Sequence, residues 1–126
     1  MHEFAIVQSI CDAALDEARR HGAVRVGSVT CRAGVLRQLV PEIMENVFLL
    51  LSEGTPLEGA RLTVEREGVV VACAACGNTA TVYEIPLGCS ACLSSEVRCT
   101  GGQDIMLTAM EIDTETGIGN PGIAAP

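Results

Sequence analysis

Four cysteines stand in two pairs whose spacing is typical of a metal site. The pairs are Cys73-Ala-Ala-Cys76 and Cys89-Ser-Ala-Cys92, with twelve residues between them. Because only two residues separate the sulfurs of a pair, both can reach the same ion, and two such pairs can surround one tetrahedral centre. Thiolates are soft ligands, and a set of four selects Zn²⁺ or iron over harder cations. We therefore expect these four cysteines to bind one metal ion.

The role expected for this metal is structural. All four ligand positions are filled by Cys, which leaves no open position where a water molecule could be activated. The segment from about 73 to 99 has too few apolar residues for a core of its own. Metal affinity would supply its folding energy, on the order of 10–16 kcal/mol in small zinc peptides. No nucleophile–base pair is apparent either, so we do not expect an enzyme.

Two disulfides are the alternative interpretation of the same pairs. The N-terminus lacks the basic region and long apolar stretch of a secretory signal, and the longest apolar run, 47–51, is too short to cross a membrane. We therefore expect a cytoplasmic, reducing location, where paired cysteines are more often metal ligands. The total of seven cysteines is odd, which also argues against a complete disulfide framework. The other three, Cys11, Cys31 and Cys99, are expected to be structural.

The first three residues, Met1, His2 and Glu3, offer a second and chemically different set of metal ligands. The α-amine of Met1, the imidazole of His2 and the backbone nitrogens of His2 and Glu3 lie within one chelating reach. Such a strong-field nitrogen set favours square-planar Ni²⁺ or Cu²⁺. Taken alone, a histidine at the second position is more often an ordinary solvated residue, so both interpretations stay open at this point.

Apolar periodicity predicts two helices. The first spans about 4–21, and its expected core stripe consists of Phe4, Val7, Ile10, Cys11, Ala14, Leu15 and Ala18. The second begins near Pro41, a residue tolerated in the first turn of a helix, and ends before Gly54. Its expected buried side chains are Ile43, Val47, Leu50 and Leu51.

Strands are expected before, between and after these features. Residues 24–31 are rich in β-branched side chains, and residues 60–65 alternate strictly between apolar and polar. Residues 105–112 carry apolar side chains on both faces, which favours an interior position in a sheet. The chain therefore runs helix–strand–helix–strand, then through the cysteine insert, and returns in a last strand.

Composition restricts the partners of the chain. Its formal net charge is −8, so it lacks the excess of Lys and Arg that collects phosphate backbones, and it suits cations or basic protein surfaces instead. Hydrophobic residues make up 48% of the chain but aromatic residues only 2%, so the core must be largely aliphatic. Residues 114–126 are rich in Gly, Pro and Thr, and we expect a flexible tail there.

Taken together, these features resemble the HypA/HybF family of hydrogenase maturation factors, which are nickel metallochaperones. The resemblance runs from Met1 to about Asp113, and Ser90 and Leu93 depart from it, because the family often has Pro and Gly there. Beside the cysteine pairs it rests on Met1-His2-Glu3, Val29-Thr30-Cys31-Arg32-Ala33-Gly34, Pro41-Glu42-Ile43-Met44, Gly59-Ala60-Arg61-Leu62-Thr63-Val64, Gly102 and Glu111-Ile112.

The resemblance implies an α+β fold in two parts and a tail. A nickel-binding domain, 1–68 and 101–113, would pack two helices on a small sheet of about three strands. A zinc-ribbon-like module, 69–100, would be inserted before the last strand, and a flexible tail, 114–126, would follow. The implied ligands are Cys73, Cys76, Cys89 and Cys92 for structural Zn(II), and Met1, His2 and Glu3 for Ni(II), which is the transferred cargo.

The same resemblance implies a function. The chain would deliver nickel for maturation of the large subunit of nickel–iron hydrogenase, together with the GTPase HypB, and some family members also serve urease maturation. Two other functions share the cysteine spacing. A zinc-ribbon module that binds nucleic acid or protein is opposed by the acidic charge in its nucleic-acid form, and a rubredoxin-like iron carrier would not need the separate α/β domain. Monomer and homodimer both stay open.

Overall fold

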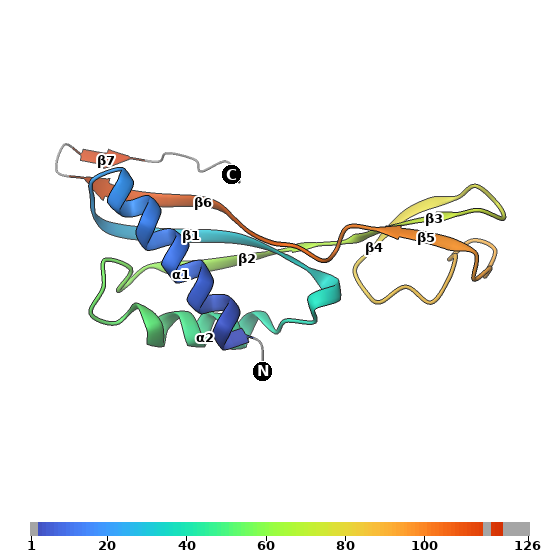
Figure 1. The fold of residues 1–126 in the computed structure, drawn as a ribbon, viewed down its shortest axis with the longest axis horizontal. Helices are drawn as coiled ribbons and strands as arrows, with labels where there is room; N and C mark the ends of the chain where they lie inside the picture. Colours follow the sequence, from blue (N-terminus) through green and yellow to red (C-terminus); the bar gives the residue numbers. More distant parts are fainter. Residues whose placement is uncertain (1–2, 115–116, 120–126) are drawn as a thin grey trace. The chain divides into compact units, whose positions relative to one another are not determined.

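The computed structural model describes residues 3–114 and 117–119. Two α-helices, α1 (Glu3–Arg20) and α2 (Pro41–Ser52), are accompanied by a short 3₁₀-helix, η1 (Val35–Arg37) (Figure 1). The strands are β1 (Ala23–Gly34), β2 (Arg61–Glu67), β3 (Val69–Cys73), β4 (Thr79–Val82), β5 (Val97–Thr100), β6 (Ile105–Thr114) and β7 (Gly117–Gly119). The predicted helices and strands are thus present, with ends shifted by at most three residues.

The chain divides into two compact units. The first comprises residues 1–32, 39–65 and 106–126, and the second comprises residues 33–38 and 66–105. We refer to them as unit 1 and unit 2. The second unit contains the cysteine insert together with η1, a segment that the sequence gives no reason to group with it.

Unit 1 contains both α-helices and a four-stranded sheet in the order β2-β1-β6-β7 (Figure 1). The two helices contact each other, and the core is aliphatic as expected, with Phe48 as its one fully buried aromatic side chain. β6 lies inside the sheet, between β1 and β7, which matches its two apolar faces. The predicted α+β class is confirmed.

The sheet has one more strand than the three expected. β7 pairs antiparallel with the end of β6, with Ile112 opposite Gly119 and Thr114 opposite Gly117. Both the end of β6 and β7 fall in the segment predicted to be a flexible tail. The remainder of that segment, 115–116 and 120–126, lies outside the described residues.

The prediction of the buried face of α2 was wrong. The structure buries Met44, Phe48 and Ser52, whereas Ile43 and Leu50 are 42% and 62% exposed. α2 carries apolar side chains on more than one face, so periodicity alone could not choose among them. Burying Phe48 completely removes the most apolar surface from water, and this choice rotates the other stripe outward.

The predicted stripe of α1 is correct except at Phe4 and at Leu15, which is only half-buried. Val7, Ile10, Cys11, Ala14 and Ala18 are buried, as expected. At the first turn, however, Phe4 is 47% exposed and the Glu3 side chain is buried instead. A charged residue in this position requires a specific partner, because burying an unpaired carboxylate is costly.

Unit 2 contains a three-stranded antiparallel sheet in the order β4-β3-β5, with Val70 opposite Thr81 on one side and Thr100 on the other. Gly34 and η1 are held in this unit by backbone hydrogen bonds. The Gly34 N–H donates to the carbonyl of Asp104 and the Leu36 N–H to that of Gly102, both at 2.8 Å. Gly34 must be a glycine here, because a Cβ would lie 2.2 Å from the carbonyl carbon of Gly102.

Neither helix of the described chain, 3–114 and 117–119, has the length and hydropathy required to span a membrane.

Candidate metal centre

Two similar turns in unit 2 carry the four paired cysteines. Cys73 ends β3, and Cys76 follows in the first turn, where the Gly77 N–H donates to the Cys73 carbonyl at 3.0 Å. In the second turn the Leu93 N–H donates to the Cys89 carbonyl at 2.9 Å. Both residues that close the turns have left-handed backbone, with φ of +78° at Gly77 and +65° at Leu93. The two pairs therefore have the same local geometry despite their different sequences.

The four sulfurs converge. All of them lie within 4.8 Å of one another, and they form the group of potential metal ligands found in the described part of the chain. Two of the separations, Cys73 Sγ to Cys92 Sγ and Cys76 Sγ to Cys89 Sγ, are 3.6 Å. A tetrahedral zinc ion with Zn–S bonds of about 2.3 Å places its sulfurs about 3.8 Å apart. The arrangement fits zinc, with each close pair made of one sulfur from each turn.

Backbone amides point at two of the sulfurs. The Cys76 N–H donates to Cys73 Sγ at 3.4 Å, while the N–H groups of Ala91 and Cys92 donate to Cys89 Sγ at 3.3 and 3.5 Å. The amides of Cys92 and Ala91 lower the pKa of Cys89 to about 6. Such bonds favour the thiolate, which is the form that binds metal.

The three other cysteines are not part of this cluster. Cys11 and Cys31 are buried, and burial raises the pKa of each to about 11, with smaller contributions from Asp12 and Glu65, respectively. They act as small core residues, as expected. Cys99 is exposed and lies on β5.

The predicted N-terminal ligands are described only in part, because Met1 and His2 lie outside the described residues. Glu3 is the first residue of α1, and its side chain is 7% exposed. Its Oε2 accepts a hydrogen bond from the Val40 N–H at 3.2 Å. Val40 is the N-cap of α2 and has no side-chain cap of its own, so the Glu3 carboxylate lies at the positive end of that helix.

This contact joins residues 37 positions apart in the sequence. A glutamate at the start of a helix indicates only a favourable interaction with that helix's own dipole. Sequence reasoning missed the partner because nothing local marks Val40 as the donor. The contact anchors the first residue of α1 to the first turn of α2.

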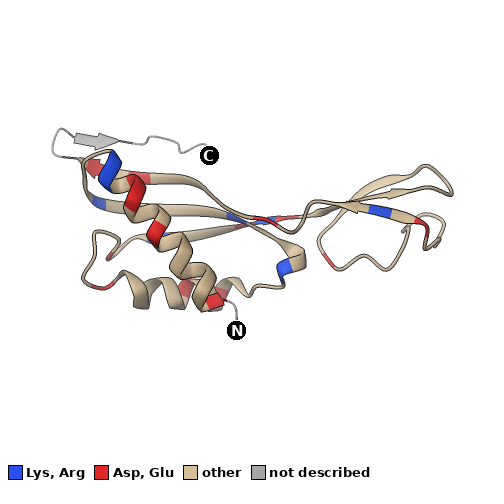
Figure 2. Cartoon of the chain, viewed as in Figure 1, with Lys and Arg blue, Asp and Glu red and all other residues tan. Residues whose placement is uncertain are grey.

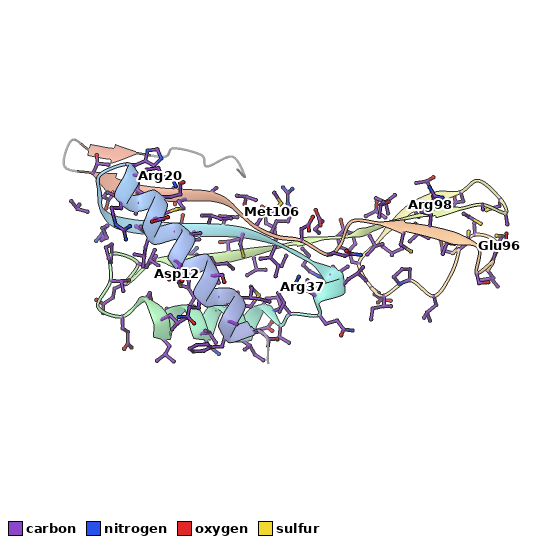
Figure 3. The ribbon with its side chains drawn as sticks, viewed as in Figure 1. Asp12, Arg20, Arg37, Glu96, Arg98 and Met106 are labelled. Atoms are coloured by element: carbon purple, nitrogen blue, oxygen red, sulfur yellow. The ribbon has the colours of Figure 1, made fainter. Side chains whose placement is uncertain are left out.

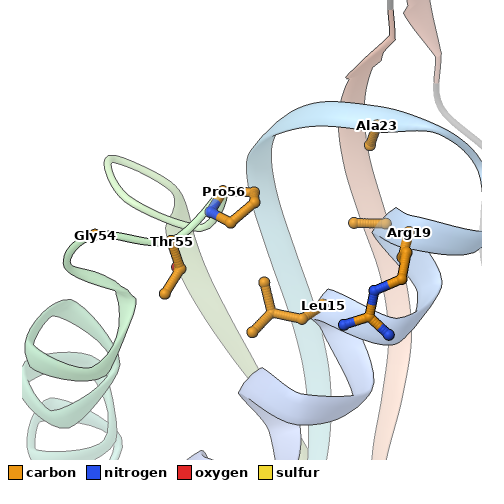
Figure 4. A pocket seen from close by; sticks show the side chains of 7 residues that line it. Leu15, Arg19, Ala23, Gly54, Thr55 and Pro56 are labelled. Atoms are coloured by element: carbon orange, nitrogen blue, oxygen red, sulfur yellow. The ribbon is translucent and has the colours of Figure 1, made fainter.

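A shallow pocket of about 330 Å³ lies at the opposite end of α1 (Figure 4). Leu15, Ala18 and Arg19 of α1 line it, together with Ala23 and the segment 54–56. Its lining contains no His, Cys, Asp or Glu, and Arg19 is engaged by Asp16 at 3.0 Å. It is therefore unsuited to hold a metal ion.

Comparison with known proteins agrees with this geometry. Residues 1–112 match the model of a family described as "Hydrogenase/urease nickel incorporation, metallochaperone, hypA". The chain belongs to the HypA family. Among its relatives is the hydrogenase maturation factor HypA of Aquifex aeolicus, 35% identical over 115 residues that cover 91% of this chain and 100% of the relative. HypA of Methanopyrus kandleri is 44% identical over 78 residues, 62% of this chain and 55% of the relative.

This chain also has the same fold as a solved HypA structure. The solution structure of the Ni metallochaperone HypA from Helicobacter pylori superposes with a TM-score of 0.62 at 23% identity, covering 91% of this chain and all of that one. At that identity the likeness concerns the fold alone. The predicted HypA membership is confirmed by the family match, and with it the function of a nickel metallochaperone in hydrogenase maturation.

Proposed function

We propose that this chain binds Ni(II) at its N-terminus and holds a structural Zn(II) on Cys73, Cys76, Cys89 and Cys92. The nickel donors are the amine of Met1, the imidazole of His2 and the backbone nitrogens of His2 and Glu3. One observation supports this most directly: the nickel-incorporation family model begins at residue 1, so Met1-His2-Glu3 falls inside the match. Residues 1–68 and 101–113 act as the nickel domain and 69–100 as the zinc module.

The position of Glu3 at the start of α1 suits this role. The first four N–H groups of a helix have no carbonyl one turn earlier to bind, so deprotonating the Glu3 amide for nickel breaks no bond within the helix. One oxygen of the Glu3 carboxylate, Oε2, accepts from the Val40 N–H. In this proposal Glu3 contributes its backbone nitrogen to nickel, while its side chain ties the start of α1 to Val40.

The cargo is delivered to the large-subunit precursor of nickel–iron hydrogenase in the cytoplasm. A HypB-type GTPase and, in nickel-dependent ureolysis, urease maturation factors are the partners of this exchange. No step of the delivery requires catalysis by the chain itself, because a square-planar nitrogen set releases its metal when the amides are reprotonated.

Nickel titration of untagged, zinc-loaded protein tests the proposal. Adding one residue before Met1, or the substitution His2→Ala, should abolish high-affinity Ni(II) binding and leave one zinc per chain. The matched control is His21→Ala, which removes the other histidine, an exposed residue 3.5 Å from Glu17. Unchanged nickel affinity in both N-terminal variants would show that the site lies elsewhere.

The two functions of Glu3 can be separated in the same titration. Glu3→Gln keeps an oxygen that can accept from Val40 and should bind nickel as the parent does. Glu3→Ala loses that contact and should destabilise unit 1 by about 1.5–3 kcal/mol, the usual contribution of a hydrogen bond to a charged group. A Glu3→Gln protein that is stable but unable to bind nickel would instead make the carboxylate a ligand.

A further inference from the structure

A row of apolar side chains runs along the outside of α2. Val40, Ile43, Val47 and Leu50, here called the outer stripe, are spaced by three, four and three residues, so they lie on one side of the helix. Val40 is 39% exposed, Ile43 42% and Leu50 62%, while Val47 is half-buried. The covered face of α2 is a different one, formed by Met44, Phe48 and Ser52.

Single exposed leucines are ordinary, but a row at helical spacing is not. An amphipathic helix needs one apolar stripe to pack on its own domain, and α2 already uses that stripe. A second stripe leaves apolar area in water and marks a surface that another molecule covers. The i, i+3, i+7 and i+10 pattern is the one with which helices insert into apolar grooves of partner proteins.

Charge identifies the kind of partner. α2 carries two exposed acidic residues, Glu42 and Glu45, and no Lys or Arg, and Glu53 follows its end. Residues 1–32, 39–65 and 106–126, which form unit 1, contain five arginines against twelve acidic residues. Figure 2 marks acidic residues in red on both helices. A second copy would bring acid against acid. The complementary surface is apolar with a rim of Lys and Arg.

The outer stripe also begins beside the start of α1. Val40, its first residue, is the one whose N–H donates to the Glu3 carboxylate. Figure 3 shows the start of α1 close to α2, within unit 1. A protein seated on the stripe would therefore have its edge next to Glu3, the first residue of α1.

We propose that the outer stripe is the docking surface for the protein that exchanges nickel with this chain, a partner with an apolar groove rimmed by basic residues. The identity of the cargo rests on the function proposed above, whereas the docking surface itself does not. Docking along α2 would bring the partner to Glu3, the residue that follows Met1 and His2 in the chain.

The experiment measures binding of the zinc-loaded chain to two probes from the same organism, the HypB-type GTPase and the hydrogenase large-subunit precursor. Leu50→Ser and Ile43→Ser should each weaken binding of at least one probe by tenfold or more. Leu87→Ser is the matched control, because Leu87 is 95% exposed but lies in unit 2, outside the helix that carries the stripe and its acidic neighbours. It should change the affinity less than threefold.

A second experiment tests the acidic residues of α2 by reversing their charge. Glu42→Lys with Glu45→Lys should weaken binding and reduce its dependence on salt. Glu84→Lys with Glu96→Lys changes the net charge equally on exposed residues of unit 2 and should leave affinity unchanged.

Three results would overturn the proposal. Wild-type affinity of Leu50→Ser and Ile43→Ser for both probes would remove the stripe from the interface. Equal weakening by Leu87→Ser would make the effect non-specific. A wild-type dimer in sedimentation that Leu50→Ser dissociates would assign the stripe to a second copy.

Nickel titration of the same variants separates the two proposals. Leu50→Ser should bind nickel as the wild type does, because only the docking surface is changed. His2→Ala should lose nickel binding, because it changes the proposed nickel site.

Discussion

At the scale of single residues, the two cysteine turns differ at the position that closes each turn, where the backbone has a positive φ. Gly77 and Leu93 both close a turn with positive φ, but only glycine adopts that conformation without cost. Leu93 is also 86% exposed, so its side chain gains little by packing. The second turn is therefore the more strained of the two.

Substituting Leu93 should reveal this strain. Leu93→Gly removes a left-handed penalty of about 1–2 kcal/mol, and the greater freedom of glycine in the unfolded chain offsets about 0.5–1 kcal/mol of it. We expect a net gain of about 0.5–1 kcal/mol in the unfolding free energy of the zinc-loaded protein, measured by denaturant titration. Leu93→Ala keeps a Cβ and should bring no gain. Equal stabilisation by both variants would exclude strain as the cause.

The three cysteines outside the metal site should differ in their reactivity, because one is exposed and two are buried. In the folded, zinc-loaded protein at pH 8, iodoacetamide should modify the exposed Cys99 first and spare Cys11 and Cys31, whose pKa is raised to about 11 by burial. The pKa of these thiols is 9.0 without the fold and about 11 in the folded protein, so folding favours the protonated thiol. Their contribution to the free energy of unfolding is therefore complete below pH 9 and is lost as pH rises through 11. Mass spectrometry of digests reports the order, and early labelling of Cys31 would contradict it.

At the scale of elements, close backbone approach makes one glycine of β1 indispensable and another replaceable. Gly34→Ala should destabilise the protein by about 1–3 kcal/mol, because its Cβ would overlap the backbone of Gly102. Gly27→Ala in the same strand meets only ordinary contacts at 3.8 Å and should be neutral or slightly stabilising. Thermal unfolding of the two variants checks the difference, and similar melting temperatures would rule out the close approach.

Periodicity predicted the elements well where only one face was apolar. The alternation of 60–65 placed Ala60 and Leu62 in the core and left Arg61 and Thr63 exposed, as observed. It failed on α2, which has two apolar stripes, because periodicity measures how apolar a face is but not which face the sheet accepts.

At the scale of the whole molecule, the two units should depend on zinc unequally. Unit 2 has few buried apolar side chains besides Val69 and Val71, whereas unit 1 has a continuous core. Removing zinc with a chelator should abolish hydrogen-exchange protection of the amides in 66–100 and preserve that of α1 and α2. Re-adding zinc should restore protection. Equal loss in both units would show that they fold as one cooperative body.

The sequence by itself determined the features that depend on short separations along the chain. These are the cysteine pairs, whose two-residue gaps set the ligand geometry, the bounds of the helices, and the motifs that indicate the HypA family. Such features follow from local backbone geometry, which a few neighbouring residues specify.

Only the tertiary structure decided the features that depend on distant segments. It joined the Glu3 carboxylate to the Val40 N–H, placed Gly34 against Gly102, and left the outer stripe of α2 exposed. Each results from competition among many possible long-range contacts, in which total burial and hydrogen bonding choose the arrangement. No local pattern records that outcome, so the partner of Glu3 and the exposed face of α2 are known from the fold rather than from the sequence.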